Sequence, residues 1–368
     1  MFLPKFMIDK IIKKEMKNFI IASLLFVAFA QSAFAQKAKG IAEGTGYYLP
    51  CTELRFTVKI EKTSYKPGEF AVYAEKYMKL KDVQTTPSVS YRILGIDVNS
   101  EGERDTSKFY MLPVNSKNNI RSVRLDDDGV LLAINAEPRQ IDYPAPFKAA
   151  PKPAPLNPHD FMNEDILTAG SVAKMAELCA LEIYDIRDSK SMLSKGQADF
   201  MPKDGEQLRI MLNNLETNEN ALMQLFAGVT DKDTTEAVIK FVPSNVTDKQ
   251  LLFRFSKRIG LTDADDLAGN PYYISVEDKH IMPSIEDGLL SKKKAKDNGG
   301  LYVNLPGKIK VTLFNGDKQW IAYELYAAQF GKSVELDEGL FDKNLVTSVV
   351  LNPVTGNLES IDIENIKK

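Results

Sequence analysis

The chain has 368 residues, of which 44% are hydrophobic and 26% are charged, a balance typical of a folded globular protein and not of a disordered one. Its 47 basic and 50 acidic side chains give a formal net charge of −3, without the excess of positive charge expected of a nucleic-acid-binding protein. A chain of this length is long enough for two or three domains with buried cores.

Residues 1–35 have the pattern of a signal peptide. Several lysines precede an apolar run from Phe19 to Ala30, and Ala33-Phe34-Ala35 supplies the small residues of a cleavage site. The apolar run is too short to span a bilayer comfortably, and no later segment is longer and as apolar. We therefore expect export with cleavage near Ala35, a location in the periplasm or on the cell surface, and no transmembrane segment in the mature chain.

Residues 36–140 have the patterns of a β-rich N-terminal domain. Apolar and polar residues alternate from Leu54 to Ile60, which predicts a strand with one buried face. Pro67-Gly68 breaks this pattern, and the helical spacing of the next apolar residues, from Phe70 to Tyr77, predicts a short helix. An Asp-Gly turn at Gly129 predicts a hairpin between the apolar residues on its two sides.

A proline-rich linker and a helical segment follow. Residues 141–160 contain six prolines, which favour an extended chain that cannot form a core. In residues 161–230, Ser171 and Asp204 are placed to cap two helices with apolar stripes, and Gly228 is placed to end the second. Because the connection between the two stripes is short, we expect an antiparallel helical hairpin.

Residues 231–368 return to strand patterns and form the expected β-rich C-terminal domain. Asn315-Gly316 lies between two apolar strand patterns and predicts a hairpin. A last hairpin is predicted between Val349 and Ile363. The predicted fold class is therefore α+β, with two β-rich regions flanking an antiparallel helical hairpin.

Several short segments of this chain resemble those of one family. They are spread over nearly the whole mature chain: Tyr47-Tyr48-Leu49-Pro50, Pro67-Gly68, Tyr73-Ala74, Tyr77, Ile183-Tyr184-Asp185-Ile186-Arg187, Leu225-Phe226-Ala227-Gly228, Leu252-Phe253-Arg254-Phe255-Ser256, Gln329-Phe330-Gly331 and Asn352-Pro353-Val354-Thr355-Gly356. In these segments the chain resembles an uncharacterised family of secreted Bacteroidetes proteins, defined by domain of unknown function four-eight-three-one. The resemblance implies an envelope protein and no known activity.

The sequence contains no complete catalytic or metal-binding motif. Ser171 and Lys174 have the S-x-x-K spacing of penicillin-recognising enzymes, but the other elements of that site are missing and Ser171 is already expected to cap a helix. His159 and His280 lack the spacing of a zinc site. The acidic runs at 126–128 and 263–266 lack the rest of a calcium loop. We predict no catalytic residue, no metal ligand and no cofactor.

Arg187 and Glu219 are the candidate structural ion pair. Glu219 lies on the apolar stripe of the second predicted helix, and Arg187 lies at the edge of the stripe of the first. In an antiparallel hairpin the two would meet and fix the register of the helices. The alternative is a catalytic glutamate, but a lone carboxylate without a visible partner favours the structural pair.

The two cysteines, Cys51 and Cys179, leave two alternatives open. In an oxidising compartment they could form a disulfide that closes a long loop. Alternatively, each is a small buried side chain, and their wide separation across two predicted segments favours this second alternative.

These patterns lead to a prediction by elimination. The protein is predicted to be a non-catalytic secreted envelope protein that binds another protein, because sheets offer edges for binding and no catalytic constellation is present. The alternative is a carbohydrate-binding module, which would stack exposed aromatic rings on sugars. The candidate rings are Tyr272, Tyr273, Trp320 and Tyr323. The expected partner is therefore an envelope protein or a glycan, and not a nucleic acid.

Overall fold

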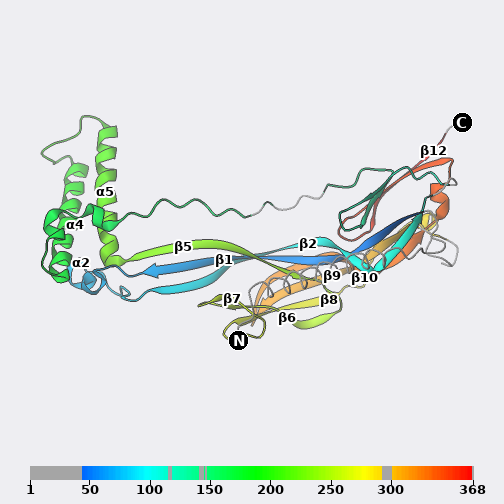
Figure 1. The fold of residues 1–368 in the computed structure, drawn as a ribbon, viewed down its shortest axis with the longest axis horizontal. Helices are drawn as coiled ribbons and strands as arrows, with labels where there is room; N and C mark the ends of the chain where they lie inside the picture. The colour runs from blue at the N-terminus through cyan, green and yellow to red at the C-terminus, as the bar shows by residue number, and fades with distance from the viewer. Residues whose placement is uncertain (1–43, 115–117, 141–144, 146, 292–300, 367–368) are drawn as a thin grey trace, which may run out of the picture.

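The computed structural model describes residues 44–114, 118–140, 145, 147–291 and 301–366, so the predicted signal peptide and the lysine-rich run after residue 291 lie outside it. Long strands and a few helices form a molecule that is drawn out along one axis (Figure 1). The expectation of a mixed fold with both helices and several sheets is confirmed. In the described residues, no helix combines the length and the apolar character needed to cross a membrane.

The strands of the described chain form three sheets, with the orders β2-β1-β5, β10-β9-β8-β6-β7 and β12-β11-β4-β3. Their bounds are β1 (Gly44–Lys66), β2 (Ser88–Pro113), β3 (Val123–Leu125), β4 (Leu131–Ile134), β5 (Val229–Phe241), β6 (Thr247–Ser256), β7 (Gly260–Thr262), β8 (Asn270–Asp278), β9 (Leu301–Asn315), β10 (Lys318–Leu336), β11 (Leu345–Leu351) and β12 (Leu358–Asn365). The helices are α2 (Ala74–Met78), α3 (Glu164–Leu167), α4 (Val172–Lys195) and α5 (Gly205–Ala227), and the 3₁₀ turns are η1 (Ala71–Tyr73), η2 (Pro158–Phe161), η3 (Asp287–Leu289) and η4 (Glu338–Phe341).

The sheet β2-β1-β5 packs against the five-stranded sheet and forms the central core. Phe56 and Val58 on β1 are fully buried and belong to the same cluster as Ile274 on β8 and Val311 on β9. The intervening Thr57 lies on the opposite face, because successive side chains of a strand alternate. The predicted alternation around these residues is therefore confirmed.

Strand β1 is much longer than the predicted segment Leu54–Ile60. It pairs with β2 from Gly44 to Tyr65, and with β5 from Leu54 to Lys66. Because both neighbours continue beyond the sandwich, the ribbon of three strands reaches from the central core to the helical end of the molecule (Figure 1).

The helices gather at one end of the molecule, where β1 ends and β5 begins (Figure 1). The predicted caps are confirmed: Ser171 Oγ accepts a hydrogen bond from the amide of Lys174 at 3.2 Å, and Asp204 Oδ1 accepts one from the amide of Gln207 at 2.7 Å. The buried faces of α4 and α5 share a second core with η1 and α2. Gly68 lies close to α5, since a Cβ there would be 2.2 Å from the carbonyl oxygen of Leu225.

The sheet β12-β11-β4-β3 lies at the opposite end and covers a third core (Figure 1). Strands β4 and β11 pair through Ile134 with Val349 and Ala133 with Val350. The two hairpins that precede and follow the helices in the chain therefore form one continuous antiparallel sheet. The pairing of β4 with β11 and that of β1 with β5 join the two β-rich segments by hydrogen bonds. The predicted domain boundaries stay a prediction.

The described part of the proline-rich linker forms no helix or strand before η2 and is exposed. It runs from the sheet that contains β4 back to the helical end (Figure 1). Lys152 forms ion pairs with Asp231 and Asp233 on β5, so the linker contacts the three-stranded sheet.

Candidate functional site

Arg187 and Glu219 meet between α4 and α5. Arg187 Nε donates a hydrogen bond to Glu219 Oε1 at 2.7 Å, and Lys190 Nζ donates one to Glu219 Oε2 at 3.0 Å. Burial raises the pKa of Glu219, but the hydrogen bonds and positive charges of these two residues outweigh burial and hold the pKa below its usual value. Both carboxylate oxygens have cationic partners, and this arrangement supports a structural role.

The four aromatic residues considered for sugar stacking do not form an exposed platform. Tyr272 is buried in the central core, because its position on β8 points it between the sheets. Trp320 and Tyr323 are half-buried and pack against the same core. Lys318 Nζ lies 3.6 Å from the centre of the Trp320 ring and occupies that face. Tyr273 is half-buried as well.

The structure does not bring the two cysteines together. Cys51 is half-buried on β1, Cys179 is buried in α4, and both are free thiols. Burial, together with the nearby carboxylates of Asp105 and Glu103, raises the pKa of Cys51. Burial raises the pKa of Cys179 to about 12. Since the thiolate is the reactive form, neither cysteine is placed to act as a nucleophile at neutral pH.

The remaining candidates of the sequence have structural partners. Lys174 Nζ donates a hydrogen bond to Glu177 at 2.9 Å, while Ser171 caps α4. Nε2 of His159 lies 3.2 Å from a carboxylate oxygen of Glu69, and His280 makes a similar contact with Asp278.

The acidic runs form turns. Asp126 Oδ1 accepts hydrogen bonds from the amides of Asp128 and Val130 at 2.9 and 2.8 Å, and Asp266 Oδ1 accepts one from the amide of Ala268 at 2.8 Å. In the part of the chain that the structure describes, no three His, Cys, Asp or Glu residues are grouped so that they could hold a metal ion.

A buried polar joint connects β1, β9 and the turn between β11 and β12. Asn304 is fully buried, and its Nδ2 donates hydrogen bonds to the carbonyl oxygens of Pro50 at 3.0 Å and Thr355 at 2.9 Å. Its Oδ1 accepts hydrogen bonds from Ser333 Oγ at 2.9 Å and Lys108 Nζ at 3.1 Å. All four hydrogen-bonding positions of the amide are filled, so this residue holds the turn rigidly on the sheet.

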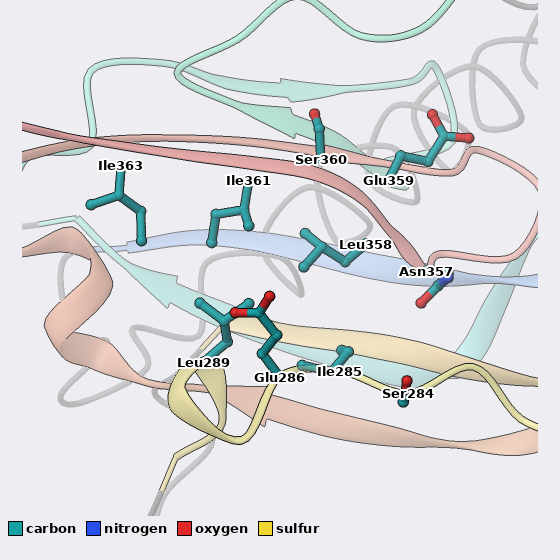
Figure 2. Close-up of a pocket in the computed structure, with 10 residues that line it drawn as sticks. All are labelled: Ser284, Ile285, Glu286, Leu289, Asn357, Leu358, Glu359, Ser360, Ile361 and Ile363. Carbon is teal, nitrogen blue, oxygen red and sulfur yellow. The ribbon is translucent and has the colours of Figure 1, made fainter.

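A groove lined by both apolar and polar side chains runs beside β12 at the same end of the molecule. Figure 2 shows side chains of β12 pointing toward the segment 284–289, whose own side chains point back toward the strand. The groove has a volume of about 440 Å³. Its apolar lining consists of Ile285, Leu289, Leu358, Ile361 and Ile363.

Strand β12 is also the edge strand of its sheet. It pairs with β11 on one side, and no other described strand pairs with it on the other. An edge strand presents backbone amides and carbonyls that can bind a further strand. The groove and the open edge therefore occur on the same element.

Acidic side chains occur on both elements that form this groove. Glu286 and Asp287 lie on the segment below β12, and Asp362 and Glu364 lie on β12 itself; all four are exposed. None of the four forms an ion pair with a residue that the structure describes. Glu359 is different, because its Oε1 accepts a hydrogen bond from Arg139 at 2.9 Å. The rim of the groove therefore carries the acidic Glu286, while Asp362 and Glu364 lie on the opposite face of β12 from Ile361 and Ile363, because successive side chains of a strand alternate.

A second hollow of about 500 Å³ lies on the other side of the turn between β11 and β12. The exposed Tyr326 and the half-buried Tyr323 contribute to its lining, together with the turn residue Asn357. Asn357 and Glu359 line both hollows, so the turn forms the wall between them.

Neither hollow could be predicted from the sequence. Their walls come from segments that are far apart in the chain, such as 284–289 and 357–363 for the groove. A local signal was present in β12, where Ile361 and Ile363 alternate with Asp362 and Glu364. Such alternation predicts a strand, but it does not reveal which face or edge is left open.

A family model described as Domain of unknown function (DUF4831) matches residues 43–359. The chain belongs to this family. No curated protein and no solved structure shows a significant match to it.

In this DUF4831 protein, several segments that carried the resemblance meet at two joints. At the helical end, the amide of Phe70, just after Pro67-Gly68, donates a hydrogen bond to the carbonyl of Leu225 at 2.7 Å. At the polar joint, the amide of Asn304 donates one to the carbonyl of Gly356 at 2.9 Å. A Cβ at Gly331 would lie 1.7 Å from a carbonyl oxygen of β9, so close packing there requires glycine.

Proposed function

We propose that this DUF4831 protein is a non-catalytic envelope component that binds another protein. The observation that carries the proposal is the open edge of β12 beside the groove. An extended segment of a partner can add to such an edge through backbone hydrogen bonds, while pockets beside the strand select alternate side chains of the segment.

The acidic side chains define the partner segment further. Glu286 at the groove, and Asp362 and Glu364 on the opposite face of β12, would attract lysine and arginine of an added strand, and the isoleucines of the groove would accept its apolar side chains. The expected ligand is therefore an extended segment in which apolar residues alternate with basic ones. Binding should weaken as the salt concentration rises, because these charges are exposed to solvent.

Selection from a library of random twelve-residue peptides tests this proposal. We expect enrichment of peptides with alternating apolar and basic residues, followed by a measurement of their affinity by fluorescence polarisation. Ile363→Asn should weaken binding at least tenfold, because it places an uncharged polar side chain in the groove and leaves the rim charge unchanged. Leu267→Asn is the matched control, since Leu267 is 83% exposed and lies in the loop between β7 and β8. Equal binding to both variants would contradict the proposal.

We also propose that the protein acts outside the cytoplasm and that α4 and α5 form an antiparallel hairpin between two β-rich regions. The signal-peptide pattern in residues 1–35 supports export. The contacts of Glu219 with Arg187 and Lys190 support the paired arrangement of the helices. The burial of Tyr272 leaves less support for a carbohydrate-binding platform made from the four aromatic residues predicted from the sequence.

A further inference from the structure

The hollow next to Tyr326 differs in chemistry from the groove beside β12. Tyr326 is 41% exposed and lies on β10, which is the edge strand of the five-stranded sheet. Around it are the hydroxyl of Ser100, the amide of Asn357, and two carboxylates, those of Glu324 and Glu359. The hollow thus combines one accessible aromatic ring with several hydrogen-bonding groups.

The two carboxylates are held in fixed positions. Glu324 lies 2.7 Å from Lys308 Nζ, and Glu359 accepts hydrogen bonds from Arg139 and, at 2.7 Å, from the amide of Asn352. The side-chain amide of Asn357, which lines both hollows, has no hydrogen-bond partner among the described residues, so its donors and its acceptor are available to a ligand. A ligand can therefore bind to these groups without a rearrangement of the turn.

We propose that this hollow binds a neutral carbohydrate. A pyranose ring has one face of C–H groups, which packs on an aromatic ring, and a rim of hydroxyl groups, which match amide and carboxylate partners. No lysine or arginine of the described chain lines the hollow, and Lys308 and Arg139 are already paired with Glu324 and Glu359, so nothing there would hold the carboxylate of a uronic acid. Tyr323, one of the four aromatic residues predicted from the sequence, also lines this hollow beside Tyr326.

Binding to immobilised oligosaccharides tests the inference. The probes are neutral hexasaccharides of glucose, mannose, xylose and N-acetylglucosamine, with polygalacturonate as the acidic comparison. We expect saturable binding of at least one neutral probe and none of polygalacturonate. Tyr326→Ala should weaken binding at least tenfold, whereas Tyr326→Phe should retain it, because the phenyl ring still stacks.

Two controls make the result specific. Phe200→Ala removes a 67% exposed aromatic ring at the helical end and should leave sugar binding unchanged. Ile363→Asn, which changes the groove, should also leave it unchanged, so the failure of peptide binding and the failure of sugar binding can be told apart. If no neutral probe binds, or if Tyr326→Ala with an unchanged melting temperature binds as well as the original protein, the inference is wrong. Binding of a protein segment at Tyr326, with no binding of a sugar there, would also overturn the inference.

Discussion

Replacement of Glu219 by glutamine tests the joint between α4 and α5. The substitution keeps the size of the side chain and removes the charge that holds Arg187 and Lys190. These cations are 40% and 30% exposed, so solvent screens each pair, and pairs of this kind contribute roughly 0.2–1 kcal/mol each. Glutamine can still accept a hydrogen bond from one of them. We therefore expect a loss of about 1 kcal/mol in the free energy of unfolding.

Urea unfolding followed by circular dichroism at the helical band measures this loss, because α4 and α5 are the long helices of the described chain. The pH dependence gives a second test. The pKa of Glu219 is held below its usual 4.5 in the folded protein, so the carboxylate stabilises the fold above that pH. This contribution is lost as the pH falls through the lowered pKa. The difference between the original protein and Glu219→Gln should therefore be present at neutral pH and disappear in acid.

Glu206→Gln provides the matched control. Glu206 also pairs with an arginine, Arg209, but both side chains are more than 60% exposed and lie on the same helix. This control should show no measurable change in the urea midpoint. Equal midpoints for Glu219→Gln and the original protein would refute the structural role, and so would a difference that grows as the pH falls.

Three further predictions concern the joints and the thiols. Asn304→Asp replaces two amide donors with a carboxylate oxygen that faces two carbonyls, and should cost roughly 3–5 kcal/mol in urea unfolding; an unchanged midpoint would contradict the role of this joint. Gly331→Ala should prevent normal folding in a thermal melt, because its Cβ would lie 1.7 Å from a carbonyl oxygen, whereas Gly95→Ala, with no atom within 4 Å of its Cβ, should melt normally. Native alkylation at pH 8 should leave Cys179 unmodified, because its pKa is raised to about 12. In urea without reductant, both Cys51 and Cys179 should react with the alkylating reagent. If mass spectrometry shows that neither thiol has been alkylated, the two cysteines form a disulfide instead.

The sequence predicted those elements whose signals lie within a few residues of one another. Ser171 and Asp204 mark the starts of α4 and α5, since a cap needs only the side chain and the next amides. Asn315-Gly316 likewise marks the turn between β9 and β10, because a tight turn depends on the residues at the turn itself. The length of β2 was not predictable, because only one of its 26 residues is buried and the strand is held by its pairing with β1 along its length.

The arrangement of the sheets depends on contacts that no local pattern carries. The pairing of Leu54 with Phe241 joins residues from opposite sides of the helical segment. Likewise, the pairing of Ile134 with Val349 joins two hairpins that the sequence presents as separate units. Each hairpin has its own turn signal, but the edge that will pair and the edge that will stay open are decided only when the chain folds. For this reason the groove beside β12 could not be located from its residues.

The segments that carry the family resemblance explain the scaffold better than they explain the binding surfaces. None of them contributes to the lining of the groove beside β12, whereas Asn352, Val354 and Thr355 of one such segment line the hollow next to Tyr326. That segment is the turn held by Asn304, so one rigid element both ties β1 to β9 and forms a wall of the hollow. The segments that carry the resemblance therefore support the hollow directly, whereas the groove beside β12 is built from residues outside them.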